Sequence, residues 1–327
     1  MTWAWTEATA GLAIGIIAAT LPAQAQVSNP YPSRAIRLVV PFAPGGAVDA
    51  TARIVGAKLQ EVFGQPVIIE NKPGVAGNLA ADAVAKSAPD GYTILQNTIG
   101  QAMSPSLFKS LPYDTLKDLA PVTQLVETGL LLVAHPAVAA NDLKELVALA
   151  KSKPGQLNYG NTGQGNPLHL AMEMLMKETG TRIQAVPFRG DAPLNTALIS
   201  GDIDVAIVPI ATALANVEAK MIKALAVSTA KRSIALPDLP TIAEQGVPGF
   251  AAESWQGLFV PAATPRAIVD RIYQATKQAM SDATVQARMK MFGSDIVASS
   301  PDVFTAKFRA DVDKYAEIIR VAKIPQQ

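Results

Sequence analysis

The sequence predicts an α/β protein of two domains, with a hinge between them and a ligand cleft at the hinge. Short apolar runs alternate with stretches of helical periodicity along most of the chain. Several of these runs end in loops that are rich in glycine and small polar residues. The length of 327 residues also exceeds what one hydrophobic core usually serves, which favours two domains.

Residues 1–25 are predicted to be a signal peptide. The stretch 11–21 is apolar and too short to span a bilayer as an anchor. Ala23 and Ala25 are the small residues that a signal peptidase recognises, so we place cleavage after Ala25. Positive charge usually precedes such a stretch, whereas the first ten residues contain one Glu and no Lys or Arg. We expect an exported protein.

A strand, a glycine turn and a helix open the folded part of the chain. The apolar run Ile36–Val40 predicts a buried strand, and the apolar spacing between Asp49 and Phe63 predicts a helix. Pro44 ends the strand, and the two glycines after it allow a tight turn. Exposed amides in such a turn, at the start of a helix, attract an anion. On this stretch alone, an ordinary strand–helix loop is an equally good interpretation.

Two more units of the same kind follow. Pro66–Glu70 predicts a strand that leads into a glycine-bearing turn and then into a helix over Leu79–Lys86. Tyr92–Asn97 predicts a third strand, which ends in the polar stretch 98–101. In an open parallel sheet such loops share one edge, and ligands bind at that edge.

The middle of the chain repeats this design. An apolar run at Leu130–Val133 precedes a helix over Leu143–Lys151, which Asp142 is placed to cap. A short strand near residue 158 then enters a glycine-rich turn that ends at Gly165, and a further helix follows. The remaining strands of this part are predicted at 183–188, 203–208 and 222–227, with a helix after the first of them.

The last part of the chain returns to the first part. Residues 236–250 are rich in proline and glycine and are predicted to be irregular, and Ser254–Pro261 reads as the returning strand. Helices are predicted over Pro265–Ala283 and Pro301–Val321. Domain 1 would then be 27–125 plus 250–327 and domain 2 would be 126–249. Two crossings between them would make the hinge.

Composition and motif searches exclude several functions. The formal net charge is +1, and no basic run is present, so neither nucleic acid nor a membrane surface is an expected partner. There is no cysteine, and His135 and His169 lack metal-ligand spacing, so we expect no metal or cofactor. Neither GxSxG nor a phosphate-binding motif is present. An α/β enzyme acting on a carboxylated metabolite remains an alternative, with Asp49, Asp191 or His169 as its general base.

The chain resembles the periplasmic solute-binding proteins of tripartite tricarboxylate transporters, the TctC or Bug family. The resemblance covers essentially all of the chain after residue 25. The matching segments are Pro41–Gly46 with Asp49, Glu70–Gly74 with Gly77, Asp90–Thr93, Tyr159–Gly165 with His169 and Leu170, Val186–Gly190 with Ala192 and Pro193, Ala224–Val227, Leu236–Thr241 with Glu244 and Gly246, and Trp255–Gly257.

The resemblance implies a periplasmic-binding-protein-like fold of type II that closes around a small carboxylate. It further implies a monomer in the periplasm, without catalysis or cofactor, that delivers its ligand to the membrane permease subunits of such a transporter. The loop Phe42–Asp49 would hold one carboxylate, and Asn161 and Thr162 would approach it from the other domain. The candidate ligand-binding residues are Phe42, Ala43, Pro44, Gly45, Gly46, Asp49, Asn71, Asn97, Tyr159, Asn161, Thr162, Gly163, Gly165, His169, Arg189, Gly190, Asp191 and Asp204.

Departures from the family pattern leave the identity of the carboxylate open. The family more often has serine where Asn161 and Thr162 stand, and often a second glycine where Asp191 stands. It commonly has Asp-Pro where this chain has Val208-Pro209. A third possible function is delivery of the loaded protein to a sensor instead of a permease.

Overall fold

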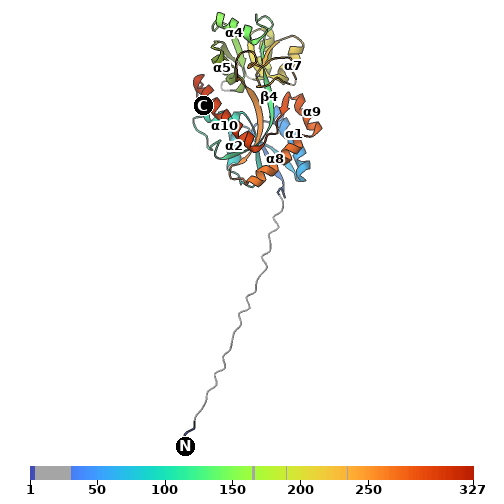
Figure 1. Cartoon of the computed structure of the whole chain (residues 1–327), viewed down its shortest axis with the longest axis vertical. Helices are drawn as coiled ribbons and strands as arrows, with labels where there is room; N and C mark the ends of the chain where they lie inside the picture. The colour runs from blue at the N-terminus through green and yellow to red at the C-terminus, as the bar shows by residue number, and fades with distance from the viewer. Residues whose placement is uncertain (4–30, 164–165, 189, 234) are drawn as a thin grey trace. The chain divides into compact units, whose positions relative to one another are not determined.

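The chain was analysed as a computed structural model (Figure 1). It divides into two units, residues 1–30 and 31–327, and all the helices and strands of the described residues belong to the second. The predicted signal peptide lies, apart from its first three residues, outside the described part of the chain. Among the residues described, no helix combines the length and the apolar character needed to cross a membrane. The structure describes residues 1–3, 31–163, 166–188, 190–233 and 235–327.

Helices and strands alternate along most of the described chain. The strands are β1 (Ile36–Val40), β2 (Val67–Asn71), β3 (Thr93–Thr98), β4 (Leu119–Ala134), β5 (Asn158–Asn161), β6 (Gln184–Pro187), β7 (Val205–Pro209), β8 (Lys223–Val227), β9 (Glu253–Pro261) and β10 (Ser294–Ile296). The helices are α1 (Ala47–Phe63), α2 (Asn78–Ala85), α3 (Gly100–Leu107), α4 (Leu143–Ser152), α5 (Pro167–Thr179), α6 (Asp191–Ser200), α7 (Ile210–Glu218), α8 (Arg266–Met280), α9 (Ala283–Met291) and α10 (Pro301–Val321), with a 3-10 turn η1 (Val75–Gly77).

The strands form one mixed sheet in the order β2-β1-β3-β9-β4-β7-β5-β6, with β8 and β10 also paired to β4. β1 is parallel to β2 and β3, and β5 is parallel to β6 and β7. β4 runs antiparallel to β7, β8, β9 and β10. Because the chain alternates helices with largely parallel strands in both halves of the sheet, the predicted α/β class is confirmed.

The long strand β4 belongs to both halves of the sheet. Its residues Leu119–Gly129 pair with β9, whereas Leu130–Ala134 pair with β7 and β8. The chain returns between Val227 and Glu253, where β8 ends and β9 begins. Figure 1 shows α4, α5 and α7 towards one end of β4, and α1, α2 and α8 towards the other. These changes of partner lie within a few residues of the predicted domain boundaries, and the division into domains stays a prediction.

The structure places most elements where the sequence predicts them. The caps explain the agreement at several helix starts: Asp142 Oδ1 accepts from Glu145 N at 2.8 Å, and Asn166 Oδ1 accepts from Leu168 N at 2.8 Å. The predicted helix Pro265–Ala283 ends earlier, at Met280, because Asp282 caps a separate helix, α9, which the prediction lacks. The predictions also lack α3, α7 and β10, and the apolar run near residue 130 is only the end of the longer β4.

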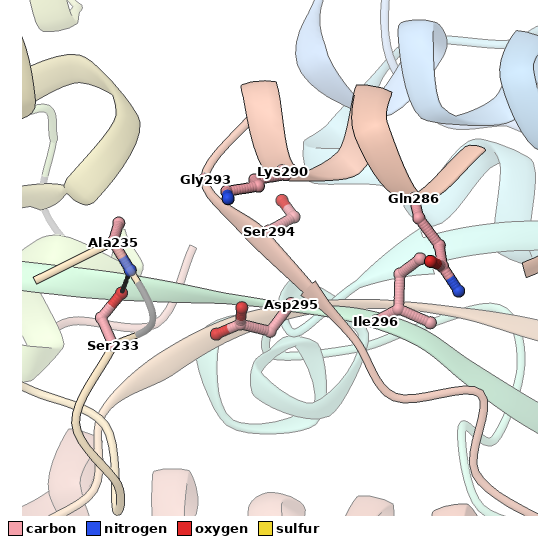
Figure 2. A pocket seen from close by; sticks show the side chains of 8 residues that line it. All are labelled: Ser233, Ala235, Gln286, Lys290, Gly293, Ser294, Asp295 and Ile296. Carbon is pink, nitrogen blue, oxygen red and sulfur yellow. Dashed lines mark hydrogen bonds between the residues drawn. The ribbon is translucent and has the colours of Figure 1, made fainter. Parts of the chain in front are cut away.

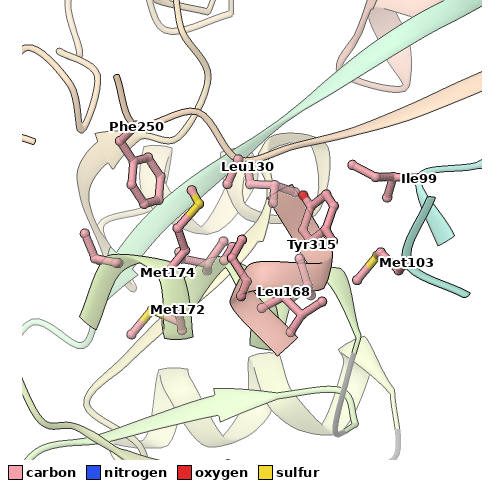
Figure 3. Close-up of a cluster of buried hydrophobic side chains, with 14 of the residues drawn as sticks. Ile99, Met103, Leu130, Leu168, Met172, Met174, Phe250 and Tyr315 are labelled. Carbon is pink, nitrogen blue, oxygen red and sulfur yellow. The ribbon is translucent and has the colours of Figure 1, made fainter. Parts of the chain in front are cut away.

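A hydrophobic core connects the two halves of the sheet. Leu130 of β4 packs in one cluster with Leu168 and Met174 of α5 and with Tyr315 of α10 (Figure 3). Trp255 of β9 is fully buried in the same cluster, where the rings of Phe304 and Phe308 meet it edge-on. Leu107 and Met176, which are partly buried, pack against this core. Leu130 and Leu168 extend this core to the wall of the cavity described below.

Buried and half-buried charged groups join α10 to β4 and β9. Lys307 forms an ion pair with Glu253 of β9, and its Nζ lies 3.6 Å from Asp311 Oδ2. Asp311 also accepts a hydrogen bond from Trp255 Nε1 at 2.9 Å. Burial, together with the nearby charge of Glu253, raises the pKa of Glu127 on β4 to about 7.

Candidate ligand-binding site

One cavity of about 320 Å³ lies beside the residues at which β4 changes partners. Its walls come from the starts of α1, α5 and α7, from the end of β3, and from β4, β9 and the α9–β10 turn. None of its lining residues carries a formal charge. Those residues are Ala47, Val48, Thr51, Thr98, Thr128, Leu130, Thr162, Asn166, Pro167, Leu168, Pro209, Ala211, Thr212, Ser254, Gln256, Phe292 and Ser294.

The start of α1 forms one wall of this cavity. Gly45 adopts φ +90, a conformation that glycine tolerates and other residues rarely adopt. Gly46 then precedes the helix and, because glycine has no side chain, provides no side-chain cap. The first amides of a helix lack intrahelical acceptors and carry partial positive charge, and here the first turn contributes Ala47 and Val48 to the cavity. This wall is suited to an anion.

Asp49 and Asn71 brace that loop from behind. Asp49 Oδ2 accepts from Gly45 N and from Arg53 Nε, both at 2.9 Å. Asn71 Nδ2 donates to Asp49 Oδ1 at 2.8 Å and to the carbonyl of Phe42 at 3.0 Å. The Arg53 guanidinium, with these further donors, lowers the pKa of the buried Asp49 carboxyl to about 2. Neither Asp49 nor Asn71 lines the cavity.

The turn after β5 forms part of the facing wall. Asn161 is buried, and its Oδ1 accepts a hydrogen bond from Gly163 N at 3.0 Å, which holds Thr162 between them at the cavity. Asn166 caps α5 and also lines the cavity. Gly165 lies outside the described residues. Thr162 lines the same cavity as Ala47 and Val48, and a ligand-binding role for this turn stays a prediction.

Tyr159 and His169 lie behind this turn. Tyr159 Oη donates to Glu173 Oε1 at 2.8 Å, and its ring stacks on that of His169 at 6.3 Å between centroids. His169 Nε2 lies 3.6 Å from the same Glu173 oxygen, and burial lowers the pKa of His169. Both rings are buried and neither lines the cavity, so they support the turn from the α5 side.

The start of α7 is a wall that the sequence analysis did not identify. Pro209 precedes the helix in an extended conformation, no side chain caps this end, and Ala211 and Thr212 line the cavity. The signal that could have found it is the dipeptide Val208-Pro209 at the end of a predicted strand, because proline is favoured just before or at a helix start.

Hydroxyl and amide groups from the crossing strands complete the polar part of the wall. Thr128 Oγ1 and Ser294 Oγ share a hydrogen bond of 2.8 Å. Gln256 Oε1 accepts from Gln96 Nε2 at 2.9 Å, and Gln96 Nε2 also donates to the carbonyl of Val48 at 3.1 Å. The sequence did not predict Thr128, Gln256 and Ser294 as site residues, because residues on strands far apart in the sequence come together only in the folded protein.

The remaining predicted residues lie apart from this cavity or outside the description. Asn97 is buried and bonded to Gln101 Oε1 and Thr98 N, at 2.7 and 2.8 Å. Asp204 precedes β7, at the opposite end of that strand from Pro209, and its Oδ2 accepts from Asn158 N at 2.8 Å. Asp204 lies at the amino end of β7, whereas the cavity lies at the carboxyl end of that strand, where Pro209 stands. Gly190 precedes α6 at φ +109, Arg189 is outside the described residues, and the side chain of Asp191 is not described.

A smaller pocket of about 200 Å³ shares Ser294 with this cavity. Figure 2 shows Ser294 and Gly293 on the segment that joins α9 to β10, with Ser233 and Ala235 approaching from a different segment. Asp295 of β10 lies at the same pocket and is exposed, although partial burial raises its pKa. The α9–β10 turn therefore separates the two hollows.

No group of three or more His, Asp or Glu side chains suited to a metal ion occurs among the described residues.

The fold is that of periplasmic binding proteins, as solved structures similar to this chain show. The chain belongs to the tripartite tricarboxylate transporter family receptors, since the model of that family matches residues 51–324. It is 33% identical over 310 residues to the protein BugT of Bordetella pertussis, which covers 94% of this chain and 95% of BugT. The resemblance stated from the sequence is confirmed.

Solved structures of similar proteins include two with carboxylates. Rpa4515 of R. palustris with adipate is 32% identical, with a TM-score of 0.75, and the match covers 91% of this chain and 100% of that one. MatC of Rhodopseudomonas palustris with bound malate is 31% identical, with a TM-score of 0.71, and covers 88% of this chain and 100% of its own.

Proposed function

We propose that this protein is a periplasmic solute-binding protein that captures a small carboxylate in the cavity beside β4 and delivers it to the membrane permease subunits of a tripartite tricarboxylate-type transporter. The observation that carries the proposal is the uncapped start of α1 at an uncharged, hydroxyl-lined cavity, in a chain that belongs to the receptor family of these transporters. The adipate and malate bound by two similar proteins support the ligand class.

The carboxylate is held by amide and hydroxyl groups in this proposal. Ala47 and Val48 offer the free amides of the first helical turn, and Thr162 offers its hydroxyl from the opposite wall. Each charge-assisted hydrogen bond contributes about 1.5–3 kcal/mol, so several of them hold a carboxylate without an arginine. Closure of the two predicted domains about β4 would exclude water and strengthen these bonds.

The other predicted site residues have supporting positions in this proposal. Asp49 and Asn71 keep the α1 loop in shape, and Tyr159 and His169 support the turn that carries Thr162. Arg189, together with Asp191, remains assigned to the distal end of the ligand on the family resemblance alone.

The proposed function is binding without catalysis. A general base must be able to take up a proton near working pH, whereas the ion pair with Arg53 lowers the pKa of Asp49 to about 2. His169 lies behind the cavity wall. The proposal further includes export through the signal peptide and a monomeric state in the periplasm, with no nucleic-acid partner and no cofactor.

Isothermal titration of the chain from residue 26 onward tests the proposal. The panel consists of adipate, malate, citrate, aromatic acids and acidic amino acids, each matched by its uncharged amide. We expect one or more carboxylates to bind and the corresponding amides to bind much more weakly, because only the anion gains from the helix start. Folded protein that binds no carboxylate in the panel would overturn the proposal, and turnover of a bound carboxylate would favour the enzyme alternative.

A further inference from the structure

Two glycines lie against the first turn of α7. A β-carbon added to Gly129 would lie 2.7 Å from Ile210 Cδ1 and 3.3 Å from Thr229 Cγ2. A β-carbon added to Gly293 would lie 3.0 Å from Ala211 Cβ and 3.1 Å from Ala211 N. Separations near 3 Å are shorter than carbon atoms normally tolerate. A side chain at residue 129 would require the end of the Ile210 side chain to move, and one at residue 293 would require the first turn of α7 to move by a few tenths of an ångström.

The two glycines and α7 belong to different halves of the sheet, which meet where β4 changes its partner from β9 to β7. Gly129 is the last residue of β4 that pairs with β9, and Gly293 lies in the turn between α9 and β10 (Figure 2). α7 follows β7, which pairs with the later part of β4. The close contact therefore joins one half of the sheet to the other.

Several residues next to this contact line the candidate site. Thr128 precedes Gly129 and Ser294 follows Gly293, and their hydroxyls are hydrogen-bonded to each other at 2.8 Å. The start of α7 lines the same cavity through Pro209, Ala211 and Thr212. A displacement of α7 from the glycines would therefore change the width of the cavity where α7 meets the crossing strands.

We propose that Gly129 and Gly293 form a glycine seat that positions the start of α7 against the ligand cavity and thereby sets the affinity for the carboxylate. This inference rests on the proposed function. The two glycines are positioning residues, since they act through α7 and are not themselves among the residues that line the cavity.

Gly293→Ala, with Gly64→Ala as its matched control, tests one half of the seat. Both glycines have a left-handed conformation, φ +60 and φ +65, so alanine causes similar backbone strain at each. Only at residue 293 does the new methyl group meet another element, because nothing lies within 4 Å of a β-carbon at residue 64. We measure melting temperature and the Kd for the tightest carboxylate of the panel.

We expect the two variants to lose similar thermal stability, and only Gly293→Ala to bind the carboxylate more weakly, by about tenfold. A role confined to stability would lower the melting temperature of Gly293→Ala and leave its Kd at the wild-type value. That result would overturn the inference.

Gly129→Ala can be paired with a compensating change. Ile210→Val removes the Cδ1 atom that the new methyl group would meet at 2.7 Å. We expect Gly129→Ala to weaken binding severalfold, and the double variant Gly129→Ala/Ile210→Val to recover the Kd of Ile210→Val alone. Equal effects of Gly129→Ala with and without Ile210→Val, on both Kd and melting temperature, would show that the two residues are not coupled and would overturn the seat.

The failure of the proposed function has a different signature. If the wild-type protein binds no carboxylate, the proposed ligand is wrong, and the proposed influence of the seat on affinity is then wrong as well. The packing of the seat is still measured in that case, through the non-additivity of the Gly129→Ala and Ile210→Val melting temperatures.

Discussion

Gly46 is the last residue before α1 and precedes Ala47 and Val48, which line the cavity. It has an extended backbone at φ −80, which any residue adopts, and a β-carbon there would meet only the carbonyl of Ala43, at 3.9 Å. The fold therefore leaves room for a side chain at this residue. In the proposed function, that side chain would crowd a carboxylate that approaches the amides of Ala47 and Val48.

We expect Gly46→Val to abolish carboxylate binding, by at least about a hundredfold in Kd, while the fold is retained. The loss of a favourable residue before the helix costs about 1 kcal/mol of stability. Titration with the tightest ligand and the melting temperature of the same sample measure the two effects separately. Undiminished affinity in this variant would rule out recognition at the start of α1.

At the scale of elements, β4 and β9 contribute polar residues to the cavity on one face and charged residues to the contact with α10 on the other. Thr128 and Ser254 point towards the cavity, whereas the neighbouring Glu127 and Glu253 belong to the group around Lys307. Successive residues of a strand point to opposite faces, which explains how one pair of strands serves both. The charged face gives the molecule a pH dependence near neutrality.

Glu127 should destabilise the protein as the pH rises. Its pKa is about 7 when folded and lower when unfolded, so between these values the folded state binds more protons than the unfolded state. Stability falls with pH across that window, from about pH 4.5 to pH 7. Glu127→Gln removes this titration. The gain in the free energy of unfolding should be larger at pH 8 than at pH 5 by on the order of 1–3 kcal/mol, which corresponds to a few degrees in melting temperature.

Melting curves of wild type, Glu127→Gln and the exposed control Glu178→Gln at pH 5, 6, 7 and 8 provide the measurement. The control should keep the pH dependence of the wild type, because Glu178 is exposed and distant in sequence from this cluster. An identical gain from Glu127→Gln at pH 5 and pH 8 would contradict the argument.

At the scale of the whole molecule, β4 and the return to β9 are the two connections about which the predicted domains would close. A ligand that binds only the folded protein stabilises it by about 2.7 kcal/mol when present at a hundred times its Kd. We therefore expect saturating ligand to raise the melting temperature by several degrees and to lower the radius of gyration in solution scattering. Gly46→Val with the same ligand is the control. A raised melting temperature with an unchanged radius of gyration would leave binding intact and refute closure.

The core elements could be predicted because their signals are local. The helix Pro301–Val321 has an apolar face, a Ser300 cap and a proline at its first position, and its bounds agree with the prediction. α7 and α9 were missed because α7 follows a strand without a polar cap, and α9 is separated from α8 by only two residues. β4 was recognised only at its end, because Thr123, Gln124 and Glu127 interrupt its apolar pattern.

The candidate site could be predicted on one side and only partly on the other. The glycine loop before α1 and Thr162 after β5 have sequence signals, since turns at strand ends are rich in glycine and small polar residues. Asp49, Asn71 and Asn97 carry groups that could bind a ligand, but the structure pairs those groups with Gly45, Arg53, Phe42 and Gln101. A polar side chain does not reveal in the sequence whether its partner is a ligand or the protein.

The sequence by itself determined the α/β class, the order of most elements, the family and the glycine turn at Gly45 and Gly46 before a helix, because each depends on periodicity, turn chemistry or an ordered set of motifs. Only the tertiary structure decided that β4 joins both halves of the sheet, and that the start of α7 and the hydroxyls of Thr128 and Ser294 share one cavity. It also showed that Gly129 and Gly293 lie against α7. The physical reason is distance along the chain: residues separated by 80 or more positions meet through packing, and no local pattern encodes which of them meet.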